Sequence, residues 1–179
     1  ARAGLGQVSG VALGAGGAEV WLVHRGERVW DEQSFDSQER IRHDAPLGGR
    51  MVRRLDATTG AVLGEWGAGT FYLPHGLTFD ASRGSGEAEA RVWVTDVGLH
   101  QAMRFTLAGA LELSVGEALV PGAGRSRLCK PTAVAVDPGS SFWVADGYCN
   151  ARVVGFSAEG AFRVALAPAE HPTLAVPHA

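Results

Sequence analysis

The sequence lacks the features that mark several protein classes. Its acidic and basic side chains nearly cancel, with a formal net charge of −3, so it has no basic excess of the kind that binds nucleic acid. No apolar run approaches the ~18 to 20 residues of a membrane-spanning helix, and the chain does not start with a charged and apolar leader of the signal-peptide type. Helical periodicity is absent almost throughout. The sequence therefore predicts no nucleic-acid partner, no membrane segment and no helical fold.

Cysteine is scarce as well. The two cysteines, Cys129 and Cys149, flank one stretch of alternating apolar residues. A two-stranded hairpin returns its ends close together, so a disulfide is geometrically reasonable, and two inert buried thiols are the alternative. A bridge that closes a loop of this length would stabilise the fold by roughly 3 kcal/mol and would imply folding in an oxidising compartment. The residues alone leave both alternatives open.

Glycine, by contrast, is abundant. The chain has 25 glycines, about double the usual ~7%, which favours many tight turns between short strands. Between the cysteines, apolar runs at 133–136 and 142–145 flank an Asp-Pro-Gly turn. Because proline and glycine bound runs rich in β-branched and aromatic residues, this stretch is expected to form two short strands.

The same pattern repeats along the chain, with a proline opening a unit at Pro74, Pro131 and Pro177. A repeat of about 40 to 50 residues with four short strands per unit is typical of propeller blades. Residues 1–179 are therefore predicted to form an all-β, partial β-propeller. The expected blade-like units cover about 5–67, 71–120 and 129–167, and a further unit starts at 174–179.

Residues 25–49 interrupt the pattern with a long, polar and charged insertion. A stretch of this length without periodic structure is usually a functional loop or a disordered insertion. Trp30 and Phe35 favour a packed loop, and packing of the loop is the expected role of both rings, rather than contact with a substrate.

About three blades make an open arc, whereas a closed ring takes roughly four to eight blades and thereby protects its sheet edges. The residues Ala1–Gly4 also look like a cut into a longer chain. We therefore expect this chain to be a fragment of a larger ring.

Each unit resembles the NHL repeat, most closely at residues 144–146 (Val-Ala-Asp) and 150–153 (Asn-Ala-Arg-Val). A finer set of motifs, ordered along residues 6–178, resembles the peptidyl-α-hydroxyglycine α-amidating lyase family, the lyase half of peptidylglycine α-amidating monooxygenase. The motifs are Val23-His24-Arg25-Gly26, Val29-Trp30-Asp31, Ser34-Phe35-Asp36, Phe71-Tyr72-Leu73-Pro74-His75-Gly76-Leu77, Trp93-Val94-Thr95-Asp96 and Asp146-Gly147-Tyr148-Cys149-Asn150.

The resemblance implies an activity, a fold and two metals. The family cleaves peptidyl-α-hydroxyglycine to an α-amidated peptide and glyoxylate, which makes it a carbon–nitrogen lyase. Its fold is a six-bladed propeller with a catalytic zinc held by three histidines and a structural calcium. In this chain the resemblance assigns His75 and His178 to zinc, and the backbone carbonyls of Val11 and Leu77 to calcium.

The resemblance also implies that Tyr148 is the catalytic tyrosine, that Arg25 is an active-site arginine and that Cys129 and Cys149 form a disulfide. Tyrosine has a free pKa of about 10, and a nearby guanidinium favours its charged form. We therefore expect Tyr148 to accept the proton of the substrate hydroxyl while Arg25 holds the substrate carboxylate. Without the resemblance, His75 would be a loop histidine, Tyr148 a rim aromatic and Arg25 a surface arginine. No site role is expected for His24, His43, His100 and His171.

The third zinc histidine, the acidic calcium ligand and the second active-site arginine of the family have no match in this chain, so we expect the chain to be inactive alone. The resemblance further implies a secretory-pathway or extracellular location, with a copper-dependent hydroxylating monooxygenase domain as a candidate partner in the parent protein. The competing hypothesis is a non-enzymatic NHL propeller that acts as a protein-binding scaffold. The two Pro-His pairs and the Asp-Gly-Tyr-Cys-Asn motif favour the lyase, because a scaffold has no need of them.

Overall fold

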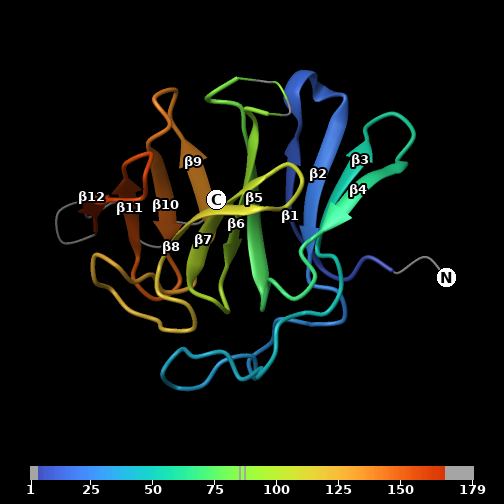
Figure 1. Ribbon diagram of the computed structural model, residues 1–179. Helices are drawn as coiled ribbons and strands as arrows, with labels where there is room; N and C mark the ends of the chain where they lie inside the picture. Colours follow the sequence, from blue (N-terminus) through green and yellow to red (C-terminus); the bar gives the residue numbers. More distant parts are fainter. Residues whose placement is uncertain (1–3, 85, 87, 168–179) are drawn as a thin grey trace.

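The computed structural model describes residues 4–84, 86 and 88–167, which form three four-stranded antiparallel sheets (Figure 1). The first sheet contains β1 (Val8–Leu13), β2 (Glu19–His24), β3 (Val52–Asp56) and β4 (Val62–Trp66). The second contains β5 (Pro74–Asp80), β6 (Arg91–Asp96), β7 (Gln101–Thr106) and β8 (Leu111–Val115). The third contains β9 (Ala133–Val136), β10 (Phe142–Asp146), β11 (Arg152–Phe156) and β12 (Phe162–Leu166).

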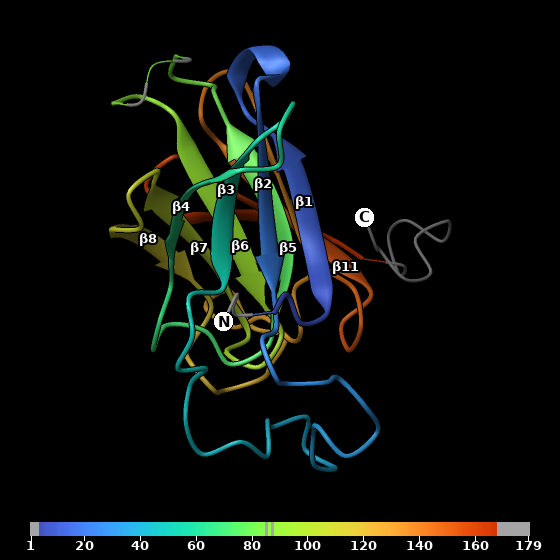
Figure 2. The ribbon, with the colours of Figure 1, turned by 90° about the vertical axis from the view of Figure 1, so that its right-hand side faces the viewer.

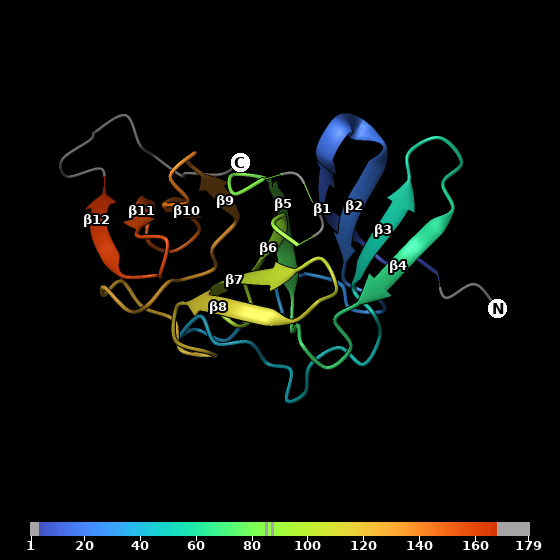
Figure 3. The same ribbon diagram turned by 45° about the horizontal axis from the view of Figure 1, so that its top comes forward.

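Within each sheet the strands lie in chain order, and the first strands of the three sheets are neighbours, with β1 beside β5 and β5 beside β9. The outer strands β4, β8 and β12 point away from this inner row (Figure 3). Apart from the short 3₁₀ turn η1 (Ala15–Gly17), the described residues contain no helix, and none long and apolar enough to cross a membrane. The predicted all-β propeller architecture is confirmed.

The apolar cores lie between neighbouring sheets. Trp21 of β2 faces Phe79 of β5 with ring centroids 6.1 Å apart, and Trp93 of β6 packs on Phe142 of β10 at 4.3 Å. Both tryptophans are 1% exposed, whereas Trp143 of β10 is 36% exposed. Trp143 is more accessible because no described sheet packs over its face.

Two glycines let the inner strands approach one another. A Cβ atom on Gly10 would lie 2.5 Å from the backbone nitrogen of Leu77, and one on Gly76 would lie 2.1 Å from the carbonyl oxygen of Thr132. Any larger residue would push the sheets apart, since neither neighbour is a flexible side chain. The pairing register of β5 also shifts between Pro74 and Leu77. Such bulges re-aim side chains next to functional sites, and this one contains His75.

The long connection between β2 and β3 is a folded loop, as predicted from its aromatic residues. It lies beneath the end of the sheets where β2 stops (Figure 2). Phe35 pairs with Ile41 in an isolated bridge and belongs to a small buried cluster with Leu73 and Val97. Trp30 packs against that cluster. The loop is therefore tied to the second sheet by apolar burial.

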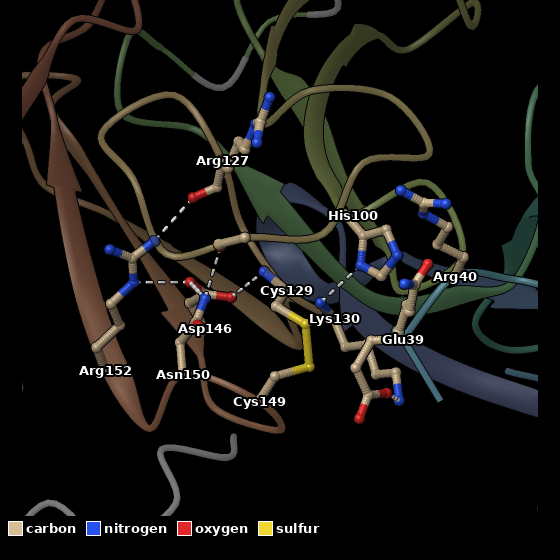
Figure 4. The surroundings of a disulfide bond; sticks show 12 residues. Glu39, Arg40, His100, Arg127, Cys129, Lys130, Asp146, Cys149, Asn150 and Arg152 are labelled. Carbon is tan, nitrogen blue, oxygen red and sulfur yellow. Dashed lines mark hydrogen bonds and ion pairs between the residues drawn. A yellow bond between two sulfur atoms is a disulfide. The ribbon is translucent and has the colours of Figure 1, made fainter. Parts of the chain in front are cut away.

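The tip of the loop is fastened to the third sheet by Lys130, the only lysine in the sequence. Its ammonium pairs with the Glu39 carboxylate and lies 4.0 Å from the centroid of the Phe35 ring. Its backbone N–H donates to Nδ1 of the buried His100 over 3.1 Å (Figure 4). Glu39, His100 and Lys130 all have positive φ, at 64°, 58° and 58°. Three residues in an uncommon backbone conformation thus meet at one junction.

Buried aspartates end β6 and β10, and each one binds the segment that enters the inner strand of its own sheet, β5 or β9. Asp146 accepts hydrogen bonds from the Cys129 N–H, the Asn150 amide and the Arg152 guanidinium, at 2.7, 2.7 and 2.8 Å (Figure 4). Asp96 instead accepts from backbone N–H groups, those of Tyr72, Leu73, Gly98 and Leu99. Burial raises the pKa of both carboxyls, and these hydrogen bonds oppose that rise. Both aspartates fix the segments around the candidate site.

Candidate active site

The bulge in β5 presents the His75 ring between two partners. Its Nδ1 lies 3.3 Å from the Thr132 carbonyl oxygen, and its Nε2 lies 3.3 Å from the Tyr148 hydroxyl. A carbonyl oxygen only accepts hydrogen bonds, so this contact favours the tautomer with the proton on Nδ1. Nε2 then carries the lone pair of the neutral ring. A backbone carbonyl on one ring nitrogen is also how proteins orient a histidine that binds a metal through the other.

Tyr148 lies just beyond β10, and its position is tied to the disulfide through its neighbour Cys149. Cys129 and Cys149 are bonded, with their Cα atoms 5.6 Å apart, so the disulfide implied by the family resemblance is present and the buried-thiol alternative is wrong. The tyrosine side chain is 42% exposed, which leaves it accessible from solvent. The disulfide therefore links the segment that leads into β9 to Cys149, the residue that follows Tyr148.

Arg25 directly follows β2 and is buried. Its Nε donates to the Pro74 carbonyl over 3.0 Å, and its Nη1 donates to the Gln7 side-chain oxygen over 3.1 Å. The Ser9 hydroxyl donates to the same Pro74 carbonyl over 2.9 Å. Among the described residues, Nη2 of Arg25 makes no hydrogen bond. The guanidinium is held in place by two of its nitrogens and keeps donors for an anionic ligand.

Trp30 lies in contact with all three of these side chains. Its ring is edge-on to His75, with centroids 5.6 Å apart, and edge-on to Tyr148 at 5.0 Å. The guanidinium carbon of Arg25 lies 5.2 Å from its centroid, a cation–π contact. The loop thus supplies an aromatic side chain to the centre of the cluster, in addition to the packing role that the sequence predicted for it.

The electrostatics of Tyr148 differ in net effect from the sequence-based expectation. Burial raises the pKa of its phenol, and the positive charge of Arg25 opposes this with a smaller lowering. Arg25 acts in the expected direction but does not outweigh burial. Its own pKa is lowered by burial, and the neighbouring Tyr148 and Asp96 act in the opposite direction. In the described structure the phenol is therefore in its neutral form near pH 7.

The structure describes three of the four predicted metal ligands, His75, Val11 and Leu77. His178 lies outside the described residues, and within the described part of the chain no three His, Cys, Asp or Glu side chains are grouped to hold a metal ion. His75 has the donor atom and the orientation that suit zinc. Val11 of β1 and Leu77 of β5 lie on adjoining inner strands, since the backbone of Leu77 touches Gly10. The assignment of their carbonyls to calcium stays a prediction.

Comparison with known proteins shows which families the chain resembles. The NHL repeat family matches residues 128–156. Peptidyl-alpha-hydroxyglycine alpha-amidating lyase 2 of Drosophila melanogaster is 39% identical over 178 residues, which cover 97% of this chain and 42% of that protein. A probable lyase of the same name from Caenorhabditis elegans is 40% identical over 157 residues, 87% of this chain and 43% of the relative. The chain belongs to this lyase family.

A third relative has a broader name. Peptidyl-glycine alpha-amidating monooxygenase B of Xenopus laevis is 43% identical over 162 residues, covering 88% of this chain and 18% of that protein. The chain therefore spans less than half the length of the curated relatives that it matches.

Solved structures share the fold at low sequence identity. Virginiamycin B lyase from Staphylococcus aureus matches with a TM-score of 0.52 and 14% identity, over 89% of this chain and 41% of that one. A Bacteroides thetaiotaomicron protein of unknown function matches with a TM-score of 0.56 and 16% identity, over 88% and 35%. These similarities support the propeller architecture alone.

Several contacts of the candidate site have no signal in the sequence. The contact of Trp30 with His75 and Tyr148 depends on how the loop folds back, and nothing in the local pattern encodes it. Gln7 and Thr132 bind Arg25 and His75 through a single atom each, without a recognisable motif.

Proposed function

We propose that the chain forms part of a zinc-dependent lyase that cleaves peptidyl-α-hydroxyglycine to an α-amidated peptide and glyoxylate. The main support is that His75, Tyr148 and Arg25, taken from three separate segments, meet around Trp30 in a chain about 40% identical to named lyases of this reaction. A binding scaffold would not require these residues to meet. The non-enzymatic propeller stays as the alternative hypothesis.

The proposed reaction breaks the bond between the amide nitrogen and the hydroxylated α-carbon. The α-carbon oxygen becomes the aldehyde of glyoxylate and loses its proton, and the departing amide nitrogen gains a proton. Atoms and electrons balance without any oxidant or reductant. The residues therefore have two tasks, to hold the anionic glycolate end and to move a proton between oxygen and nitrogen.

Arg25 suits the first task. Its Nε and Nη1 are occupied by Pro74 and Gln7, so the side chain is rigid, while its positive charge faces the Tyr148 region. Guanidinium groups bind carboxylates through charge-assisted hydrogen bonds. We assign Arg25 to the substrate carboxylate.

Tyr148 suits the second task, because its hydroxyl is accessible and lies within hydrogen-bond distance of a histidine nitrogen. We assign it to proton exchange with the substrate hydroxyl. Its raised pKa means that loss of its proton needs help from added positive charge nearby, since burial disfavours the phenolate.

His75 would hold zinc through Nε2, with His178 as a further ligand. When bound, such an ion supplies positive charge that polarises the substrate oxygen and lowers the pKa of groups beside it. The lone pair on Nε2 can accept the Tyr148 hydrogen bond or bind a metal, but it cannot do both. Metal loading would therefore release the Tyr148 hydroxyl from His75. The carbonyls of Val11 and Leu77 are the proposed contribution of this chain to a structural calcium site, since carbonyl oxygens are ligands that calcium prefers.

The disulfide supports the proposal that the protein folds in an oxidising compartment, and we propose that its location is the secretory pathway or the extracellular space. The relatives named as monooxygenases make a linked hydroxylating domain the proposed partner, because that chemistry would produce the substrate.

The function is tested in a longer chain that continues this one to the length of its relatives. Tyr148→Phe should abolish glyoxylate release from a hydroxyglycine-extended peptide while zinc content stays unchanged. His75→Ala should remove both zinc and activity, and His43→Ala, a loop histidine outside the site, should alter neither. Loss of zinc from Tyr148→Phe, or full activity of His75→Ala, would contradict the assignment.

A further inference from the structure

Trp30 is the point at which the three candidate catalytic residues meet. Its ring centroid lies 5.6 Å from that of His75 in β5 and 5.0 Å from that of Tyr148, which follows β10. The guanidinium carbon of Arg25, which follows β2, lies 5.2 Å from the same centroid. His75 lies in the second sheet, whereas Arg25 follows a strand of the first sheet and Tyr148 follows a strand of the third. A single side chain from the long loop thus links all three sheets at the site.

Trp30 is itself well fixed. Its ring packs edge-on against Phe35, with centroids 6.0 Å apart, and Phe35 is anchored in the buried cluster with Leu73 and Val97. Its backbone N–H lies 3.3 Å from the Gln7 side-chain oxygen, the same atom that accepts from Arg25. Trp30 and Arg25 are therefore held by one shared acceptor.

The Tyr148 ring needs such support more than the other two residues do. It lies outside the strands and is 42% exposed, whereas Arg25 is buried and His75 is part of β5. Trp30 and His75 both meet the ring edge to face, with interplanar angles of 69° and 70°. These two contacts restrict how the phenol ring can tilt while its hydroxyl stays within 3.3 Å of Nε2 of His75. Edge-to-face packing is a preferred geometry for aromatic pairs, so the two contacts favour one orientation of the ring.

We infer that Trp30 is a positioning residue of the lyase site, which sets the orientation of the Tyr148 ring relative to His75 and Arg25. The inference rests on the proposed function. The indole is chemically inert in this reaction, so it acts only through its neighbours. Trp30→Phe keeps an aromatic edge at this place, and Trp30→Ala removes it.

The first test measures the orientation directly, in the 179-residue chain. The sequence has two tyrosines, Tyr72 and Tyr148, so ring-labelled tyrosine gives two sets of NMR signals, assigned with Tyr72→Phe. Trp30→Ala should move the Tyr148 ring signals toward those of free tyrosine, because the ring current of the indole is lost. Trp30→Phe should retain most of the shift. The Tyr72 signals should stay in place and show that the fold is intact.

The second test measures turnover in the longer chain. Trp30→Ala should lower kcat by about 10²-fold with KM changed less than about threefold, since misplacement of reacting groups costs about this much in rate. Trp30→Phe should restore most of kcat. Leu111→Ala is the control, because it removes a 56% exposed apolar side chain on β8, outside the cluster and on the sheet that already has a neighbouring sheet on each side.

The outcomes separate the two proposals. If the wild type releases glyoxylate and Trp30→Ala is as active as Leu111→Ala, the role of Trp30 is overturned and the lyase proposal stands. Unchanged Tyr148 signals in Trp30→Ala would also overturn it. If the wild-type longer chain releases no glyoxylate and binds no zinc, both proposals fail. A raised KM with unchanged kcat would place Trp30 in substrate binding and would overturn the positioning role.

Discussion

The buried pair of Asp146 and Arg152 offers the sharpest test of what holds the third sheet and the disulfide in place. Asp146 has a fully buried side chain and Arg152 is 8% exposed, with 2.8 Å between the carboxylate oxygen and Nε. The other guanidinium nitrogens donate to the carbonyls of Ala123, Gly124 and Arg127. The Asp146→Asn substitution keeps the shape of the side chain but leaves a buried guanidinium without its counter-charge.

Breaking a buried pair by neutralising one partner costs about 3–5 kcal/mol, because the remaining charge is uncompensated. Against a typical total stability of about 5–15 kcal/mol, this is a large share. The measurement is urea unfolding at neutral pH with the disulfide intact, followed by circular dichroism. Glu117→Gln is the control, since its pair with Arg127 spans 2.7 Å between side chains 47% and 48% exposed. Such surface pairs contribute about 0–1 kcal/mol.

A second variant separates the charge effect from simple loss of a contact. The double substitution Asp146→Asn with Arg152→Met removes both charges, so it should be more stable than Asp146→Asn alone. If Asp146→Asn costs no more than Glu117→Gln, the reasoning about the buried charge is wrong. If the double variant is less stable than the single one, the hydrogen bonds of Arg152 to the carbonyls dominate and the charge is secondary.

Two further predictions concern the junction around the disulfide. Replacing Cys129 and Cys149 by serine should lower the free energy of unfolding by roughly 3 kcal/mol, measured by urea unfolding, because the open chain regains loop entropy; an unchanged midpoint would contradict this. Burial, with the charge of Lys130, lowers the pKa of His100 from 6.5 to about 4. The neutral His100 ring therefore makes its full contribution to the free energy of unfolding above pH 6.5, and this contribution is lost as the pH falls through 4. The loss should reach roughly 2 to 3 kcal/mol at pH 4 and should be absent in His100→Asn. Melting curves of the wild type and of His100→Asn, each recorded at pH 7 and at pH 4, measure this difference.

The sequence predicted the repeating part of the fold well, because that part is encoded by local rules. Alternating apolar residues and Pro-Gly turns define the strands around Asp137–Gly139, and the structure has β9 and β10 there. The family motifs likewise pointed to His75 and Tyr148, which the structure places within hydrogen-bond distance. Residues that recur at fixed positions in a repeat can be recognised without knowing their contacts.

The contacts between repeats could not be predicted, since they join residues far apart in the sequence. In the sequence, Lys130 and Glu39 are two distant charged residues with no sign of a contact, and only the folded loop brings them together. The net direction of the Tyr148 pKa could not be predicted for a similar reason. The charge of Arg25 is visible in the sequence, but the degree of burial that outweighs it depends on the three-dimensional surroundings.

The Thr132 carbonyl has two roles at once. It accepts a hydrogen bond from the Thr95 hydroxyl over 3.0 Å, which links the second sheet to the third, and it is also the partner of Nδ1 of His75. The spacing of two blades and the aim of a candidate metal ligand are thus set by one oxygen atom. Any substitution that slides one blade along the other, however deep in the core, must carry the imidazole with it. Mutational tolerance in this propeller should therefore be limited by the geometry of the inner strands, and less by the chemistry of the side chains that fill the space between blades.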